Sequence, residues 1–300
     1  MRLKAIVTAA VISAAILPAG FAVYAEEENN FTYTIINEEA TITGYSGDPA
    51  YIEIPKNLDG FPVTQLRDNA FFNCTSLKQI SLPSTITSIG HHAFYSCTAL
   101  ESIVLPESLQ EIGMGAFSGC ENLSAINIPE SLKKLPESCF RQCISLTEIV
   151  IPNGIYEIGD FCFSSCESLS YVSIGNNLNK IGIGSFYLCP SLESLYIPPS
   201  VTDIGYESVG FINGSDSQSK VKSEFIITGK KDSAAEKYAD DNEISFSSAG
   251  EAIQSPFPLS SKIRKIPMWA IFLISALGIG FFSLSCIIAV RQHFSEKNRH

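Results

Sequence analysis

A repeat with a period of 23 positions dominates this chain. A phenylalanine, a cysteine and a leucine recur together at that interval in six successive copies, so the period does not depend on any one position. The cysteines of this column are Cys74, Cys97, Cys120, Cys143, Cys166 and Cys189. A copy of this length is too short to bury its own apolar side chains, so successive copies must stack. The sequence therefore predicts a solenoid of similar coils.

Each copy also carries the apolar spacing L-x-x-I-x-L, which in one copy consists of Leu100, Ile103 and Leu105. Ile103 and Leu105 are separated by one residue and followed by Pro106, as in a short strand with one buried face. A period of roughly 20–29 residues with this spacing is typical of a leucine-rich-repeat solenoid. We expect a curved right-handed superhelix with one short parallel strand per coil and short helical or irregular segments on the other side.

A glycine follows the apolar positions in most copies, as at Gly113, but Arg67 and Pro136 take its place in two copies. Proline fixes φ at about −65°, so this position does not require a positive φ. We expect the glycine to be there because neighbouring coils pack closely.

The N-terminal end of the sequence has the features of an export signal. Arg2 and Lys4 precede an apolar run over residues 5–23, and Val23-Tyr24-Ala25 fits the pattern of a signal-peptidase site. We predict a signal peptide over residues 1–25, cleaved between Ala25 and Glu26. A first transmembrane anchor is the alternative, but the short apolar core favours a cleaved signal.

Residues 267–290 contain no charged residue in 24 positions. As a helix, such a run covers roughly 36 Å, enough to cross a hydrocarbon core about 30 Å thick. A buried core helix is the alternative, but the solenoid needs no such element. We predict a transmembrane helix over residues 266–290, a linker over residues 247–265 and a tail over residues 291–300. The protein would be a single-pass protein of the cell membrane, with extracellular repeats and a cytoplasmic C-terminus.

The stacked coils have two ends that need covering. The expected parts are an N-terminal cap with a first partial repeat over residues 26–65, the leucine-rich repeats over residues 66–212 and a C-terminal cap over residues 213–246. Within the C-terminal cap we predict a strand over residues 225–229 and a short helix over residues 233–239. A capping box formed by Ser233 and Glu236 would open this helix.

The repeated motif I-G-x-x-A-F-x-x-C-x-x-L-x-x-I-x-L-P, together with both caps, resembles the BspA-like leucine-rich repeat family of surface proteins over about residues 31–246. This resemblance implies a curved solenoid used for adhesion or protein binding at a microbial surface. The sequence lacks the ladder of asparagines that follows the strand in commoner leucine-rich repeats. The residues in its place are Thr85, Ser108, Ser131, Gly154, Asn177 and Ser200. We expect serine and threonine to replace the asparagine hydrogen bonds only in part.

Four cysteines form the spacing C-x3-C twice, at Cys139 and Cys143 and again at Cys162 and Cys166. Cys143 and Cys166 belong to the repeated column, and the other two replace an alanine of other copies. We expect the thiols to fill the core as small apolar groups, with disulfides and a zinc site as the alternatives. We predict no metal ion and no cofactor.

The composition argues against other function classes. A formal charge of −11 disfavours nucleic acid as a partner. His91 and His92 are the only histidines before residue 267, and we expect them to be solvated at a turn, without the third group that a catalytic triad needs. Glutamates on alternate coils would stand roughly 10 Å apart, near the carboxylate spacing of inverting glycosidases, but on a face without a pocket. We predict a protein that is not an enzyme.

The outward residues of the predicted strands are the best candidates for ligand binding. The candidate residues are Glu148, Val150, Tyr171, Ser173, Glu193 and Tyr196. We expect this face to be concave, with Tyr171 and Tyr196 near each other on adjacent coils and Val150 beside them. The predicted partner is an extracellular or host-surface protein or glycan. The alternative is a structural spacer or envelope-assembly protein.

Overall fold

The computed structural model describes residues 25–28, 30–213 and 218–248. The chain divides into two compact units, residues 1–253 and 254–300, and all described residues belong to the first.

Several predicted segments lie outside the described residues. These are residues 1–24 of the signal peptide, residues 249–265 of the linker, the transmembrane helix at residues 266–290 and the tail at residues 291–300. Within the part of the chain that the structure describes, no helix has the length and apolar character that crossing a membrane requires.

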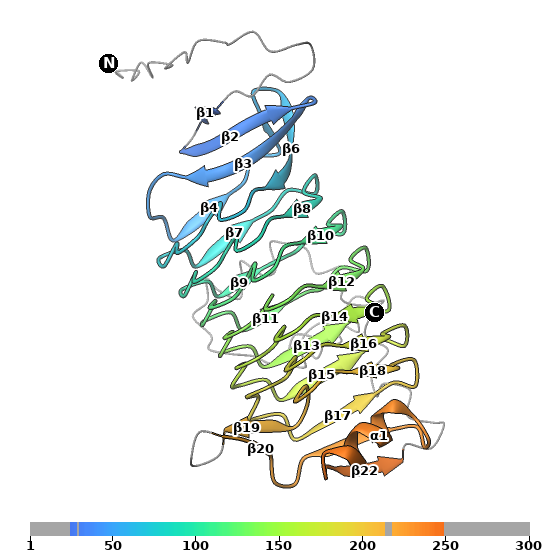
Figure 1. The fold of residues 1–300 in the computed structure, drawn as a ribbon. Helices are drawn as coiled ribbons and strands as arrows, with labels where there is room; N and C mark the ends of the chain where they lie inside the picture. Colours follow the sequence, from blue (N-terminus) through green and yellow to red (C-terminus); the bar gives the residue numbers. More distant parts are fainter. Residues whose placement is uncertain (1–24, 29, 214–217, 249–300) are drawn as a thin grey trace, which may run out of the picture. The chain divides into compact units, whose positions relative to one another are not determined.

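Each repeat forms one coil that contributes a short strand to each of two parallel ladders (Figure 1). The first ladder follows the L-x-x-I-x-L positions, in the order β4 (Tyr51–Glu53), β7 (Gln79–Ser81), β9 (Ser102–Ile103), β11 (Ala125–Ile126), β13 (Glu148–Ile151), β15 (Tyr171–Ile174), β17 (Ser194–Ile197), β21 (Ile226–Gly229) and β22 (Ser245–Ser248). Its strands pair in parallel, with interruptions between β11 and β13 and between β15 and β17.

The second ladder lies further along each coil. It comprises β3 (Glu39–Tyr45), β6 (Phe61–Leu66), β8 (Ser88–Ile89), β10 (Glu111–Ile112), β12 (Lys134–Leu135), β14 (Glu157–Ile158), β16 (Lys180–Ile181) and β18 (Asp203–Ile204). The prediction of one strand per coil is therefore wrong. Six of these strands have only two residues, so their sequences show no alternation, and their pairing depends on the neighbouring coils.

The third side of each coil is irregular, which was one of the two predicted alternatives. Backbone N–H groups alternately bond within the coil and across to the next coil, so Phe94 donates to Ala116 at 2.8 Å while Tyr95 donates to His92 at 3.0 Å. The alternation needs two positive φ values per coil, for example 54° at His92 and 56° at Ser96. These turns satisfy the backbone without a helix.

A column of stacked phenylalanines fills the centre of the coils. Successive rings lie 5.2 to 5.5 Å apart and within 11° of parallel from Phe71 to Phe186. The repeated leucines, such as Leu100 and Leu123, are buried beside them. The core is thus continuous from coil to coil, as the fixed period predicts.

The close-packing explanation of the repeated glycine is confirmed. A Cβ added to Gly159 would lie 2.6 Å from the backbone nitrogen of Glu137, and one added to Gly182 would lie 2.6 Å from that of Asp160. Neither glycine has a positive φ. The backbone of each coil therefore occupies the space that a side chain in the next coil would need.

The second ladder is interrupted where proline replaces this glycine. Gly159 donates its N–H to the carbonyl of Leu135 at 2.8 Å. Pro136 has no N–H to donate and carries a ring in the same crowded place. Pro136 directly follows β12, and β12 is not paired with β10 of the preceding coil.

A hydroxyl spine replaces part of the expected asparagine ladder. Thr85 donates to the carbonyl of Val63 at 2.6 Å, and Ser108 and Ser131 make the equivalent bonds at 2.6 and 2.5 Å. The hydroxyl of Ser200, at the same repeat position, is buried and makes no hydrogen bond to any described residue. The expectation of partial replacement is confirmed.

We expect Thr85→Val to lower the free energy of unfolding by about 1–2 kcal/mol. The change keeps the shape of the side chain but removes its hydroxyl, so the carbonyl of Val63 loses this hydrogen-bond donor. Ser200→Ala is the matched control. It should leave stability unchanged or slightly raised, since the buried hydroxyl of Ser200 makes no hydrogen bond that the change could remove. Equilibrium urea unfolding measures both. Equal losses in the two variants would contradict a stabilising role for the spine.

Strands cover the N-terminal end of the coils. β1 (Ala25–Glu28), β2 (Phe31–Ile36) and β3 pair antiparallel, and β3 then pairs in parallel with β6. β5 (Asn57–Leu58) pairs with the start of β6. The predicted cleavage site between Ala25 and Glu26 falls within β1, and cleavage there stays a prediction.

The C-terminal end is covered by β19 (Phe211–Asn213), β20 (Ser219–Val221), β21, β22 and helix α1 (Ala234–Asp241). The predicted strand and helix are therefore confirmed. The predicted capping box is wrong in detail, because Ser233 makes no cap bond and Glu236 accepts the N–H of Asp232 instead. The hydroxyl of Tyr238 anchors the helix by accepting from Val209 N at 3.1 Å, and burial raises the pKa of Tyr238 to about 12.

Candidate ligand-binding face

The strands of the first ladder hold the predicted site residues in a regular pattern. In β13, Ile149 and Ile151 are buried, while Glu148 and Val150 between them are partly exposed. This follows from the two-residue period of a strand, which sends alternate side chains to opposite faces. We call the outward surface of these strands the first-ladder face.

The register brings four of the six predicted residues into direct pairs. Glu148 lies opposite Tyr171, and Val150 lies opposite Ser173. Neighbouring strands are about 4.8 Å apart, so each pair can bind one ligand group together. The four residues form a compact block over β13 and β15.

Tyr196 and Glu193 lie on the next coil, outside this block of four residues. Tyr196 follows Ser173 by one repeat period, so it is in line with Ser173 and not with Tyr171. Its register partner in β21 is Thr228. Glu193 is exposed and precedes β17, where its carbonyl accepts the N–H of Ile226 at 3.2 Å. The two tyrosines are therefore diagonal neighbours and not directly opposed.

Exposed apolar side chains continue along this face beyond the predicted residues. Tyr51 on β4 is 68% exposed, Val104 just after β9 is 44% exposed and Ile226 on β21 is 40% exposed. Tyr51 lies outside the clear repeats, which is why the sequence pattern did not single it out. The face offers apolar contacts on both the N-terminal and the C-terminal coils.

A second exposed aromatic group lies on the irregular side of the coils and was missed from the sequence. The rings of Phe72 and Tyr95 stack at 5.2 Å and 5° from parallel, and His92 meets Tyr95 edge-on at 5.5 Å. Phe72 is 50% exposed. Phe72 and Tyr95 each directly follow a core phenylalanine, so they occupy the same repeat position. That shared position could have predicted that the two rings stack.

His91 has a structural contact that the sequence did not indicate. Its Nδ1 accepts the N–H of Met114 at 2.9 Å, and its own N–H donates to Asp68 at 2.7 Å. The prediction of a merely solvated residue is therefore incomplete.

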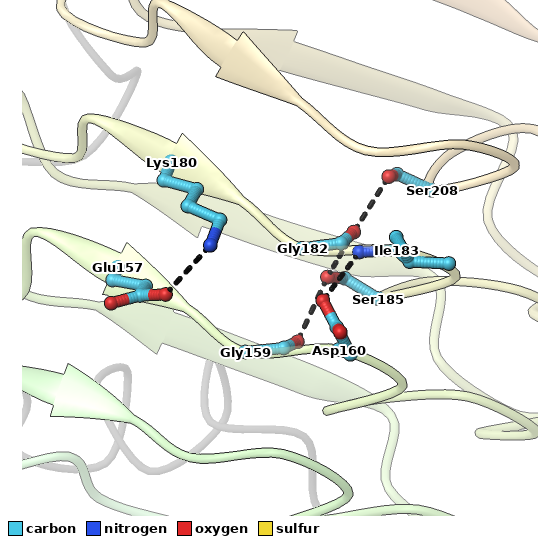
Figure 2. A network of polar contacts seen from close by, with 8 residues as sticks. All are labelled: Glu157, Gly159, Asp160, Lys180, Gly182, Ile183, Ser185 and Ser208. Carbon is cyan, nitrogen blue, oxygen red and sulfur yellow. Dashed lines mark hydrogen bonds and ion pairs between the residues drawn. The ribbon is translucent and has the colours of Figure 1, made fainter.

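The polar residues of the later coils serve to join one coil to the next (Figure 2). Lys180 on β16 pairs with Glu157 on β14 at 3.1 Å, and this bond to Glu157 raises the pKa of Lys180. Asp160 accepts the N–H of Ile183 at 2.8 Å. Both contacts join residues that are one repeat period apart, so they secure stacking and do not converge on a common point.

Figure 2 also shows how serine replaces the small inward residue of earlier coils. Ser185 lies 3.0 Å from the carbonyl of Gly159 and 2.8 Å from that of Gly182, and Ser208 donates to Gly182 at 2.6 Å. Both serines are fully buried with their hydroxyls satisfied. Alanine or cysteine occupies the same position in the preceding coils.

The eight described cysteines are free thiols, and seven of them are buried. Core filling is therefore confirmed, with an addition. Five thiols each donate to the carbonyl of a phenylalanine in the preceding coil, at 3.0 to 3.3 Å, and these are Cys97, Cys120, Cys143, Cys166 and Cys189. Burial raises the pKa of Cys189 to about 12. Among the described residues, no group of three or more possible ligands could hold a metal ion.

Comparison with solved structures gives the same architecture. The leucine-rich-repeat protein of T. pallidum is 32% identical, with a TM-score of 0.55 over 61% of this chain and 86% of that protein. A leucine-rich-repeat protein from Eubacterium ventriosum is 27% identical, with a TM-score of 0.55 over 60% of this chain. The match spans 48% of the E. ventriosum protein, about half its length. No curated protein matches the chain.

Comparison with protein families matches the repeats themselves. Residues 50–134 and 87–211 match the BspA type leucine rich repeat region, in six copies. Together these ranges cover residues 50–211, more than half of the chain. The chain therefore belongs to the BspA type leucine-rich-repeat family.

Proposed function

We propose that this protein is a non-catalytic binding module at a cell surface, and that its first-ladder face engages an extracellular protein or glycan. The observation that carries the proposal is the line of partly exposed tyrosine and aliphatic side chains on that face. Leucine-rich-repeat folds of this kind are typically protein-binding scaffolds without enzymatic activity, which supports a binding role.

The block over β13 and β15 is the proposed centre of the contact. Tyr171 presents a large ring beside the carboxylate of Glu148, and Val150 adds an apolar surface next to it. Tyrosine contributes strongly to binding because it buries much area at little cost in conformational entropy. The coils fix the spacing of these side chains before a ligand arrives, which lowers the entropy cost of binding.

The proposed location follows from the ends of the sequence. A cleaved signal peptide over residues 1–25 and a transmembrane helix over residues 266–290 would place the repeats outside the cell and the tail inside. Recovery of the protein in the membrane fraction, with its repeats open to added protease in intact cells, is the expected result. A protein that is released from cells without detergent would contradict this location.

The binding proposal is tested with the double variant Tyr171→Ala and Tyr196→Ala. Full-length protein is probed against a panel of extracellular-matrix proteins and a glycan array. We expect saturable binding to at least one member, weakened about tenfold or more in the double variant. The first-ladder face loses two of its large side chains in this variant, while the buried core is unchanged.

Tyr156→Ala with Tyr206→Ala is the matched control. These tyrosines are 48% and 69% exposed but flank the second ladder, next to β14 and β18. The control should bind as the wild type does. Equal affinity in all three proteins, or equal losses in both variants, would rule out the first-ladder face as the site. Self-association without any ligand would favour the structural spacer instead.

A further inference from the structure

Cys74 differs from every other thiol in the cysteine column. It is the first cysteine of the sequence, so no cysteine-bearing coil lies on its N-terminal side. Cys74 is partly exposed, whereas the other members are buried. Solvent and small reagents therefore reach this end of the column first.

The sulfur of Cys97 lies over the turn that carries Cys74. The carbonyl of Phe71 accepts both the backbone N–H of Cys74, at 3.3 Å, and the thiol of Cys97, at 3.0 Å. The adjacent residues join the same two coils, because Asn73 donates its N–H to Tyr95 at 2.8 Å. Stacked residues about 4.8 Å apart lie within the Cα separations of about 4.4–6.8 Å that disulfides span.

The two thiols have complementary chemistry. The neighbouring thiol of Cys97 lowers the pKa of Cys74, while the contact with Cys74 and burial raise the pKa of Cys97. The thiolate is the nucleophilic form of cysteine, so Cys74 is the better nucleophile of the pair at neutral pH. The partly exposed thiol is thus also the activated one.

We propose that Cys74 is an oxidation site for peroxides and that Cys97 is its resolving thiol. The thiolate of Cys74 attacks one oxygen of hydrogen peroxide, which breaks the O–O bond, forms a sulfenic acid and releases hydroxide that takes up a proton as water. The thiol of Cys97 then attacks the sulfenic sulfur, forms the disulfide and releases the second water. Two thiols lose two electrons in all, and peroxide accepts them.

The disulfide closes only at this end of the column. Parallel Cβ vectors disfavour a bridge between stacked residues, so one coil must shift for the bond to form. The coil of Cys74 is held by the column on one side only, whereas the coil of Cys120 is held on both sides by thiol-to-carbonyl bonds. The product joins the first two cysteine-bearing coils covalently.

Full-length native protein is treated with N-ethylmaleimide, and each cysteine peptide is followed by mass spectrometry. We expect Cys74 to react on the order of 100-fold faster than Cys120, which must wait for the coils to open. After hydrogen peroxide and alkylation without reduction, the expected product is a peptide pair joined through Cys74 and Cys97. In Cys97→Ser, Cys74 should stop at a sulfenic acid that dimedone traps.

Cys120→Ser is the matched control, since it removes a column thiol that is not the neighbour of Cys74. This variant should form the Cys74 to Cys97 disulfide as the wild type does. The proposal is overturned if Cys74 and Cys120 are alkylated at the same rate, if the disulfides formed do not include Cys74, or if Cys97→Ser yields no trapped sulfenic acid.

Discussion

Phe117→Ala is expected to lower the free energy of unfolding by about 3–5 kcal/mol. The ring of Phe117 is fully buried and stacks on two neighbours, 5.2 Å from Phe94 and 5.5 Å from Phe140. Its removal leaves a cavity in the middle of the aromatic column and weakens two coil interfaces at once. Each coil of a solenoid is held only by its neighbours, so this loss has no distant compensation. Guanidinium unfolding followed by circular dichroism measures it.

Phe72→Ala is the control for this prediction. Phe72 is the same residue type and lies two coils before Phe117, but it is half exposed and stacks on Tyr95 alone, at 5.2 Å. We expect its loss to cost about 1 kcal/mol or less. If the two variants lose equal stability, the buried column is not what holds the coils together. A second, earlier unfolding step in Phe117→Ala would show that the stack has split at this coil.

The repeat period predicted the core because every coil needs the same inward residues. Phe94, Cys97 and Leu100 are all buried, as their recurrence in each of the six copies required. The second ladder was not predicted because most of its strands are too short to show an alternation of buried and exposed residues. Ser88–Ile89 contributes a single buried residue, and its hydrogen bonds go to other coils. A single copy of the repeat therefore carries no mark of this ladder.

The candidate site was predictable in its members but not in its register. Strand alternation placed Glu148, Val150, Tyr171 and Ser173 on one face, and the structure pairs them across β13 and β15. Tyr171 and Tyr196 were expected near each other on adjacent coils, and there they are diagonal neighbours, because Tyr196 stands two positions beyond the residue that follows Tyr171 by one period. Counting from the repeat, and not from similar residue types, gives the correct neighbours.

The polar residues of the coils show why the repeat tolerates so much variation. Asp68 and Asp160 each accept a backbone N–H from the next coil, and His91 does the same with Nδ1. Three coils place an acceptor at this position with two residue types, while Met114 and Ile183 occupy it in other coils. Because aspartate and histidine make the same hydrogen bond here, a consensus motif of residue types does not show that these positions share a role.

At Gly182 such variation is costly, and Gly182→Ala should lower the free energy of unfolding by about 2–4 kcal/mol. The added Cβ would lie 2.6 Å from backbone atoms of the preceding coil, which cannot rotate away as a side chain would. The coils must separate locally, and the bond from Gly182 N–H to the carbonyl of Ile158, now 2.8 Å, is lost. Urea unfolding measures the cost.

The wild-type chain already has one interruption of the second ladder like the one expected in this variant. Where Pro136 puts a ring at the glycine position, β10 and β12 do not pair, although the third side of the same coils stays bonded from Phe117 N–H to Cys139 at 2.9 Å. Gly182→Ala should likewise separate β14 from β16, seen as faster hydrogen exchange at residue 182. Gly44→Ala is the control, because its Cβ would lie 3.9 Å from Thr32, an ordinary contact. Unchanged exchange and stability in Gly182→Ala would mean that close approach of the backbones does not explain the glycine.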